Sequence, residues 1–475
     1  MNKTTQNIND VNFILQEIFR FTSMPWSELK DLSEDHRRDF LCCVPHPDGR
    51  GVSLICGREA YNRFYELAKR CLSAEKQRDD FDLQAFTRSI REEFVRVFLK
   101  EQKEVDERSV SKMLAAAMKK IKKMQKSLTH YIPCVIVFEN QPDRFQIGPV
   151  HFITIENFLN DHRNDFEKKR HHLRNASIEH AKKAVEKGKM AVNKIPTLED
   201  SAKHADMMVD KLLEYFKGYK WVASVTIPPC DEKVSHERAQ VTVEAALNVL
   251  RLFFGAFYGN RLRQGHSRGM ITDTAHLTRD ADGNLFIAIS QKIEHVPSGD
   301  NWFQTIIDNY AFYLEAAGSA LNSYLKTEGS SHLCQRFLDA LNWYGQAVTE
   351  QMTSAQIIKY AAALERLTVT KKEKDLTPVV TRRTALLNFD GSEEDFGRCK
   401  KDASKVYEWR SNLMHGSCSP FEKKLGTISN LAQRMTQCAL FRSLEFFLFV
   451  EHTRGYTQNN LEESYQSWET KFIQA

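Results

Sequence analysis

Two side chains near residue 410 have the types and the spacing to act on a phosphate ester. Arg410 and His415 stand in the segment VYEWRSNLMHGSCSP, with four residues between them. Histidine can take up or release a proton near neutral pH, and the planar fork of an arginine donates parallel hydrogen bonds to phosphate oxygens. We therefore predict metal-free RNA cleavage, in which His415 exchanges a proton with the ribose 2′-hydroxyl or the departing 5′-oxygen and Arg410 stabilises the charged phosphate. The product would carry a 2′,3′-cyclic phosphate.

Arginine and histidine at this spacing also occur by chance. The chain has 31 arginines and 16 histidines, so about three matches to R-x(4–6)-H are expected at random. Besides Arg410 and His415, the matches are Arg144 with His151, Arg174 with His180, and Arg261 with His266. The surrounding sequence has to decide between them.

The context of Arg410 is a helix predicted over 395–415. Gly416 is placed to end this helix as its C′ residue. On a straight helix, residues five apart differ by about 140° in direction. The pair therefore needs a site at the helix end, or one shared between two copies of the chain.

The extended pattern Y-x-x-R-S-x-x-x-H-G, from Tyr407 to Gly416, is more specific than the arginine–histidine spacing alone. It follows FLDALNWYGQAVTE (337–350), YAAALERL (360–367) and the approach segment TRRTALLN. Together these stretches, about 150 residues in all, resemble the HEPN superfamily (higher eukaryote and prokaryote nucleotide-binding helical bundles), and within it the ApeA-like branch. The resemblance does not extend into the N-terminal region.

The resemblance implies a fold, a pair of catalytic residues and a set of partners. It implies a helical bundle in which Arg410 and His415 cleave RNA, either tRNA or mRNA, without a cofactor or metal ion. It also implies a homodimer or higher homo-oligomer that packs its motif helices across a two-fold axis. Ser411 stands where many relatives have a larger polar residue and agrees with the RS form of the ApeA-like branch. An anti-phage effector is expected, with residues 1–298 sensing a phage-derived trigger.

Several polar residues near the pair are candidates for supporting roles. Glu365 could orient Arg410 from a neighbouring helix, with Tyr407 and Asn412 as polar neighbours. The residue types alone favour simpler explanations: an exposed helix charge, a core tyrosine and an amide that bonds a helix end. Lysines on the same helix could hold RNA; they are Lys400, Lys401 and Lys405. The alternative function is therefore an inactive bundle of the same type that dimerises and binds RNA or a nucleotide without cutting it.

Other motifs are weaker. The four residues Cys42, Cys43, His46 and Cys56 have zinc-binding types, but their spacing favours buried strand cysteines. Asp143, with Glu156 and Lys168, is only loosely spaced for a metal-dependent nuclease. The lysine cluster KKIKKMQK (119–126) suits either a phosphate backbone or a plain solvated helix face. The loop NRLRQGHSRG (260–269) suits either an anion or a basic helix C-terminus.

Composition and hydropathy predict the architecture that has to position these residues. The formal charge of +5 does not by itself indicate nucleic-acid binding, and no P-loop, G-x-S-x-G or H-E-x-x-H motif is found. The fold class expected is α+β, predominantly helical. Strands are predicted within 41–57 about a turn, at 131–158 as two strands, at 219–230 and at 284–290. Helices are predicted over 80–128, with a helical hairpin over 158–217 and a buried helix ending near Gly259.

The C-terminal part is expected to be all-helical. Its predicted helices are 302–325, 332–350, 354–367, 380–388, 395–415 and 427–452. The domain boundary is placed near 298, giving a mixed α and β region over 1–298, with a further break near 160–218, and a helical bundle over 299–475. The N-terminus lacks the features of a secretory signal, and a cytoplasmic location is expected.

Overall fold

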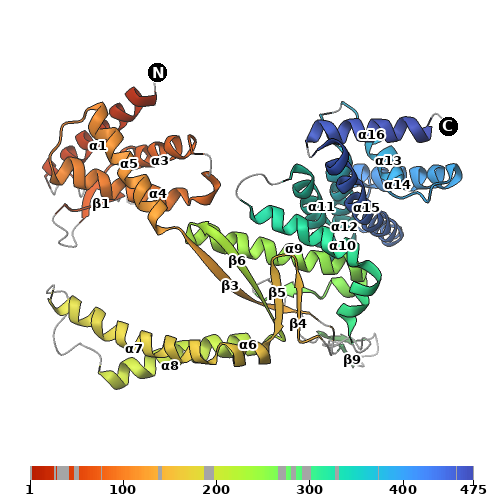
Figure 1. Ribbon diagram of the computed structural model, residues 1–475, viewed down its shortest axis with the longest axis horizontal. Helices are drawn as coiled ribbons and strands as arrows, with labels where there is room; N and C mark the ends of the chain where they lie inside the picture. The colour runs from red at the N-terminus through yellow and green to blue at the C-terminus, as the bar shows by residue number, and fades with distance from the viewer. Residues whose placement is uncertain are drawn as a thin grey trace. The chain divides into compact units, whose positions relative to one another are not determined.

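The computed structural model has an α+β fold that is predominantly helical, as predicted (Figure 1). It describes residues 3–25, 28, 42–47, 53–75, 78–136, 138, 142–186, 197–265, 274–279, 285–290, 301–326, 331–372, 374–455 and 457–473. The chain forms two compact units. Unit 1 consists of 1–128 with 227–238, and unit 2 consists of 129–226 with 239–475. The predicted domain boundary near 298 lies outside the described residues.

Unit 1 is a helical unit with a small hairpin. Its core is formed by apolar side chains that recur every three or four residues on each helix, such as Val11, Ile14 and Ile18, and by the edge-to-face contact of Phe64 with Phe94 at 5.1 Å. The predicted strand–turn–strand is confirmed as β1 paired antiparallel with β2. The elements of this unit are α1 (Lys3–Ser23), β1 (Cys42–Pro45), β2 (Ser53–Cys56), α3 (Arg58–Leu72), α4 (Leu83–Phe94) and α5 (Glu107–Met124).

The helical region predicted over 80–128 contains α4 and α5, with non-helical residues at 101–106 before α5. Its last three residues are not helical, because they begin the strand β3 (Lys126–Val135). After α4 the chain continues as a π-helical turn, η2 (Val95–Lys100), which explains the mixed spacing of the buried aromatic and aliphatic side chains there. Before α4, a short 3-10 turn, η1 (Arg78–Asp80), buries Asp80. Arg238 lies 2.6 Å from the Asp80 carboxylate, and the Asp231 N–H donates to the Asp80 carbonyl at 2.9 Å. These contacts join the chain segment 227–238 to the rest of unit 1.

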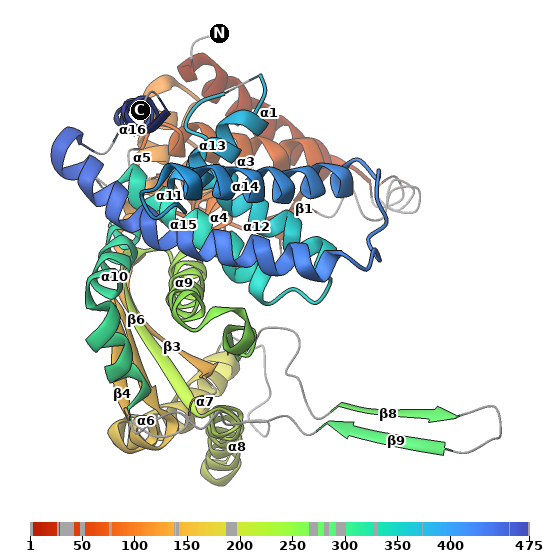
Figure 2. The same ribbon diagram turned by 90° about the vertical axis from the view of Figure 1, so that its right-hand side faces the viewer.

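A five-stranded sheet has the order β4-β5-β6-β3-β7. The segment 131–158, predicted as two strands, contains three, because the chain turns back at Gly148, where φ is +54°. Gly148 also approaches the backbone of Gly318, where a Cβ on either glycine would clash. The strands are β3 (Lys126–Val135), β4 (Arg144–Ile147), β5 (Val150–Thr154), β6 (Trp221–Cys230) and β7 (Arg263–Gln264); a separate antiparallel pair, β8 (Thr274–Arg279) and β9 (Leu285–Ser290), is visible in Figure 2.

The polar stretch after β5 forms the predicted helical hairpin. The short α6 (Ile155–Asp161) leads into α7 (Arg163–Glu186), which packs against α8 (Leu198–Lys217) (Figure 1). Arginines of α7 join the two helices: Arg170 contacts Asp206 and Asp210, and Arg174 contacts Asp206 at 2.9 Å. Pro196, the predicted break, lies outside the described residues.

The apolar helix α9 (Glu232–Gly259) is interrupted by Gly255, which has a φ of +70°. The side chain of Gln437 donates to the carbonyl of Leu252 at 2.7 Å, so a carbonyl next to the break has a partner. By length and composition α9 is the one helix of the described residues that could cross a membrane, but half of its most apolar window is buried in the protein. This burial is compatible with a soluble protein and agrees with the prediction of a buried helix.

From residue 301 onward the described residues form an all-helical bundle, and the six predicted helices are found within a few residues of their expected bounds. Figure 2 shows α11, α12, α14 and α15 lying side by side. The seventh helix, α16, was not predicted. The helices are α10 (Trp302–Leu325), α11 (His332–Val348), α12 (Thr353–Thr368), α13 (Thr377–Leu386), α14 (Glu393–Met414), α15 (Leu425–Arg454) and α16 (Gln458–Ile473).

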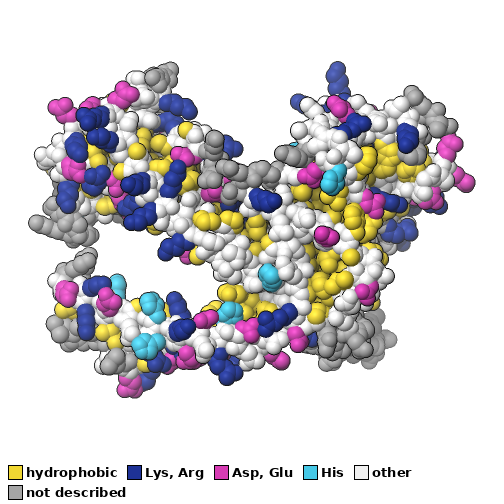
Figure 3. Space-filling view, in the orientation of Figure 1, with side chains coloured by type: hydrophobic (Ala, Val, Ile, Leu, Met, Phe, Trp, Pro, Cys, Tyr) yellow, Lys and Arg dark blue, Asp and Glu magenta, His cyan; other side chains and the backbone are white. Residues whose placement is uncertain are grey.

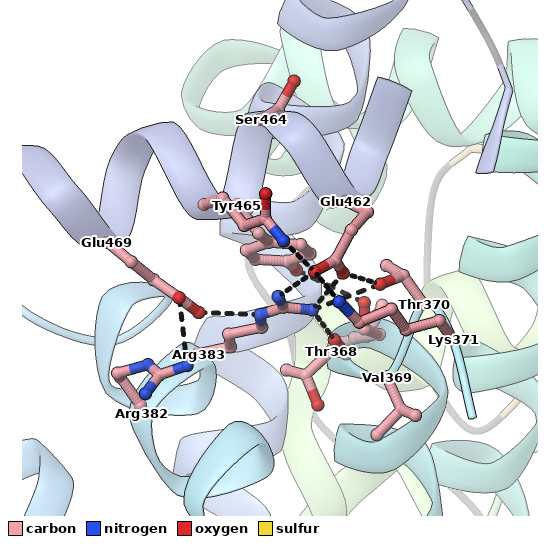
Figure 4. Close-up of polar contacts among 12 residues, drawn as sticks. Thr368, Val369, Thr370, Lys371, Arg382, Arg383, Glu462, Ser464, Tyr465 and Glu469 are labelled. Carbon is pink, nitrogen blue, oxygen red and sulfur yellow. Dashed lines mark hydrogen bonds and ion pairs between the residues drawn. The ribbon is translucent and has the colours of Figure 1, made fainter. Parts of the chain in front are cut away.

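A buried ion-pair cluster attaches α16 to the bundle (Figure 4). The guanidinium of Arg383, on α13, is 3% exposed and donates to both oxygens of Glu462 and to Glu469, at 2.8–3.0 Å. It also lies over the buried ring of Tyr465. Burial alone would raise the pKa of Glu462, but hydrogen bonds from Arg383 and Thr370, the charge of Arg383 and a hydrogen bond from Lys371 outweigh it and lower this pKa to about 2.

Candidate functional site

Helix α14 carries the candidate residues, and its sequence explains where it begins. The side chain of Ser392 accepts the Asp395 N–H at 3.2 Å, and three acidic residues occupy the first turn. Both features stabilise a helix N-terminus. The side chains of Cys399, Ala403, Val406 and Tyr407 are buried, so α14 is fixed along its length before it reaches Arg410.

The helix ends as predicted. Gly416 has a φ of +70°, which glycine adopts without strain. The Gly416 N–H donates to the carbonyl of Leu413 at 3.4 Å, and the Ser417 N–H donates to the carbonyl of Asn412 at 2.8 Å. This pair of hydrogen bonds is a Schellman motif. It makes His415 the C-cap residue, with an exposed side chain that has no hydrogen bond or ion pair within the described part of the chain.

Arg410 lies beside two residues named as supporting candidates. Its Nη2 is 3.0 Å from Oε1 of Glu365 on α12, and the Tyr407 hydroxyl donates to the same oxygen at 2.8 Å. The guanidinium carbon is 5.4 Å from the centre of the Tyr407 ring. Burial and the hydrogen bond to Glu365 raise the pKa of Tyr407 well above its ordinary value, so the hydroxyl remains a donor. Arg410 is thus oriented on one side and stays 27% exposed.

No contact between Arg410 and His415 is present among the described residues. They are five residues apart on one helix, which gives a rise of about 7.5 Å and the 140° difference in direction expected from the sequence. A substrate that meets both groups therefore has to pass around the end of α14. Within residues 393–424, which hold α14 and the turn after it, His415 is the one histidine, whereas transesterification needs both a base and an acid.

The remaining candidates lie elsewhere on α14. Lys400, Lys401 and Lys405 are exposed, and helical geometry places them about 80° to 180° away from the direction of Arg410. Ser411 and Asn412 are half-buried and contribute backbone carbonyls to the helix end, accepting the N–H groups of His415 and Ser417. The structure therefore brings together Arg410, Glu365 and Tyr407, and it does not bring the lysines to them.

A second arginine–histidine pair is brought onto one surface. In the register of β4 and β5, Arg144 lies opposite Ile153 and Gln146 lies opposite His151, so Arg144 and His151 share a face of the hairpin. They line a hollow of about 470 Å³ together with Tyr131, Asp161 and His162. Arg144, however, is 60% exposed, and its one ion pair with the residues that the structure describes is with the exposed Asp161, at 2.8 Å. Surface pairs of this kind are mobile and weak.

The sequence analysis did not find this hollow. Its acidic and aromatic walls come from β3 and α6, and only strand alternation together with the sheet order could have indicated them. His162 contacts the ring of Tyr131 at 4.9 Å and the carboxylate of Asp165 at 3.2 Å. Two side chains that line the hollow, Arg144 and His162, therefore already have partners within the chain.

In the other two matches to the spacing, the structure describes no site that the arginine and its histidine share. Arg174 joins α7 to Asp206 on α8, while His180 is on an exposed position of α7. Arg261 is 6.0 Å from the centre of the Phe257 ring, and His266 lies outside the described residues.

The candidate metal sites gain no support. Among the described residues, no group of three or more histidine, cysteine, aspartate or glutamate side chains could hold a metal ion. Asp143 and Glu156 are exposed, and Lys168 lies 3.8 Å from Asp165. Cys56 is buried on β2 opposite Cys42 in the backbone register, and the side chains of Cys42 and Cys43 lie outside the described part.

The arrangement at Arg410 thus offers an oriented guanidinium and an exposed imidazole at one helix end. A comparison of the chain with known proteins found no match among family models, curated proteins or solved structures.

Proposed function

We propose that the chain is a metal-independent endoribonuclease that uses Arg410 and His415. The observation that carries the proposal is the arginine held by Glu365 and Tyr407 near the end of α14, five residues before an exposed histidine at the helix end, where the chain forms a Schellman motif. Catalytic groups work best when neighbouring groups orient them in advance. Arg410 meets this condition and Arg144 does not.

In the proposed reaction the ribose 2′-oxygen attacks the phosphorus and the bond to the 5′-oxygen breaks. One imidazole takes the 2′-hydroxyl proton, another group supplies a proton to the 5′-oxygen, and Arg410 stabilises the extra charge on the phosphate. The products are a 2′,3′-cyclic phosphate and a 5′-hydroxyl. Because each chain offers one such histidine, the second role fits a second copy of the chain, as the HEPN resemblance implies. On that resemblance we also propose a cytoplasmic anti-phage effector, acting on tRNA or mRNA.

The test compares purified wild type with Arg410→Ala and His415→Ala on total RNA in the presence of a metal chelator, with and without lysate of phage-infected bacteria. Wild type should cleave and leave 2′,3′-cyclic phosphate ends. Each variant should cleave at least about 100-fold more slowly.

The matched controls are Arg144→Ala and His151→Ala, which remove the same side-chain types from the other shared surface. They should cleave like wild type. Cleavage by His415→Ala at the wild-type rate would disprove the catalytic assignment, and so would loss of activity on chelation alone.

The second candidate function is an RNA-binding module that does not cut. The ion pair with Glu365 favours it, because it already neutralises part of the charge of Arg410. This function predicts that wild type binds RNA without cleaving it under every condition above, and that His415→Ala binds equally well.

A further inference from the structure

A stripe of cations runs along the exposed face of α5 in unit 1. The opposite face of this helix is buried in the unit 1 core through Val110, Met113, Leu114, Ala117 and Ile121. At 100° per residue, the exposed cations fall within an arc of about 100° centred opposite that core. They are Arg108, Lys112, Lys119, Lys122 and Lys123; we call them the α5 stripe.

Most of the charge of the α5 stripe is uncompensated. Lys122 lies 2.8 Å from Glu75. For Arg108, Lys112, Lys119 and Lys123, no ion pair is present with any residue that the structure describes. The one acidic residue of α5 is Glu107, which belongs to the first turn, where it interacts favourably with the helix N-terminus. Figure 3 shows Lys and Arg side chains on the visible face of this unit, with acidic side chains among them.

We propose that the α5 stripe binds the sugar–phosphate backbone of a nucleic acid. From Arg108 to Lys123 the stripe is about 22 Å long, on a rigid helix, so several successive phosphates can be neutralised at once. Contacts of this kind read no sequence and hold RNA and DNA alike. This site lies in a different unit from Arg410, and it does not depend on the cleavage proposed above.

A membrane surface fits the stripe less well. Helices that bind in the membrane interface insert an apolar face between lipids, whereas the apolar face of α5 is already used in the core. A hollow of about 630 Å³ on the other flank of α5 does not belong to the site either. Lys120 and Lys233 line it, but so do Asp82, Glu92 and Asp231, and Lys120 is paired with Glu92. Those carboxylates repel phosphate.

The test measures binding in the full chain carrying His415→Ala, so that no RNA is cut. Fluorescence anisotropy follows a labelled 20-nucleotide RNA, and a DNA of the same sequence, between 50 and 300 mM salt. The test variant is Lys112→Gln/Lys119→Gln/Lys123→Gln. Each lost phosphate contact should reduce the slope of log K against log salt by about 0.7, hence by about 2 in all, and affinity at the lowest salt should fall more than tenfold.

The control variant is Lys211→Gln/Lys217→Gln/Lys220→Gln, which removes the same charge from exposed positions in unit 2. It should retain both the slope and most of the affinity. Equal slopes for the two triple variants would overturn the proposal, as would absence of binding to either nucleic acid. Stripe-dependent binding to anionic phosphatidylserine vesicles but not to RNA or DNA would overturn it in favour of a membrane. None of these outcomes bears on whether His415 is needed for cleavage.

Discussion

At the scale of the residue, the central feature is a single oxygen of Glu365. It accepts the Tyr407 hydroxyl and lies within ion-pair distance of Arg410. Named one by one from the sequence, these residues had simpler explanations as an exposed charge and a core tyrosine. What the sequence could not indicate is that the two contacts converge on one atom, because α12 and α14 are far apart along the chain and meet only through packing.

Substitutions of Tyr407 and Glu365 should show how much of the activity depends on the orientation of Arg410 and how much on its ion pair with Glu365. Tyr407→Phe keeps the ring beside Arg410 but removes the donor to Glu365, and we expect a few-fold fall in kcat for RNA cleavage. Glu365→Gln removes the ion pair and should lower kcat about tenfold, with little change in KM. The double variant should lose less than the product of the two effects, because both act through the position of Arg410. Steady-state cleavage assays measure these constants.

If Tyr407 and Glu365 only stabilise the fold, the result is different. Tyr407→Phe and Glu365→Gln would then both lower the melting temperature, and the fall in kcat of the double variant would equal the product of the two single effects. Unchanged kcat in Glu365→Gln would remove Glu365 as a positioning residue.

At the scale of the element, the sequence predicted the helices of the bundle well where apolar residues recur every three or four positions. Three helices were not predicted, α1 and α3 in unit 1 and α16 in the bundle, and the reasons differ between the two units. The sequence of α1 does have apolar residues at helical spacing, at Val11, Ile14, Ile18 and Phe21. This pattern is enough to indicate a helix there. In α16, buried Leu461 and Tyr465 also follow helical spacing, but its attachment depends on buried charges whose partners lie on α13. Such partners cannot be read from a local pattern.

The charge cluster under α16 predicts acid sensitivity. The pKa of Glu462 is lowered from 4.5 to about 2 in the folded chain. A lowered pKa stabilises the folded state fully above pH 4.5, and this stabilisation is lost as the pH falls from about 4.5 towards 2. The contribution is roughly 3 kcal/mol. Glu462→Gln should therefore be less stable than wild type at pH 7, and the difference should shrink between pH 5 and pH 3.

Urea unfolding followed by circular dichroism at several pH values measures this difference. Glu463→Gln is the matched control, because the carboxylate of Glu463 is next to Glu462 in the chain but is 66% exposed and lies 3.9 Å from Arg454. The stability of this variant should equal that of wild type at each pH. A stability difference for Glu462→Gln that stays constant from pH 7 to pH 3 would contradict the assignment.

At the scale of the whole molecule, the two units have separate internal packing. The sequence predicted the mixture of helices and strands but could not predict that unit 1 is completed by residues 227–238, because that closure depends on the contacts of Arg238 and Asp231 with Asp80. The candidate site could be predicted because its residues form a motif within α14. The α5 stripe could not, because its exposed face is defined only once the structure shows which residues of α5 are buried.

Core substitutions should affect the units one at a time. Phe64→Ala removes a fully buried ring from unit 1 and should cost about 3–5 kcal/mol, while Leu250→Ala removes a buried side chain from unit 2 and should cost about 2–5 kcal/mol. Hydrogen exchange measured by mass spectrometry should show faster exchange over α3, α4 and α5 in the first variant and over α9 in the second. Equal loss of protection in both units from either substitution would show that they unfold together.

Because unit 1 is assembled from two stretches of chain, no single cut can release it whole. A fragment that starts at residue 129 would keep 227–238 but discard the Asp80 carboxylate and carbonyl that those residues bind. A fragment that stops at 128 would keep the buried carboxylate of Asp80 but lack Arg238, its ion-pair partner. To isolate unit 1, residues 1–128 should therefore be joined to 227–238 through a short linker. To isolate unit 2, the chain should start at 129, and a linker should replace 227–238 between β6 and α9.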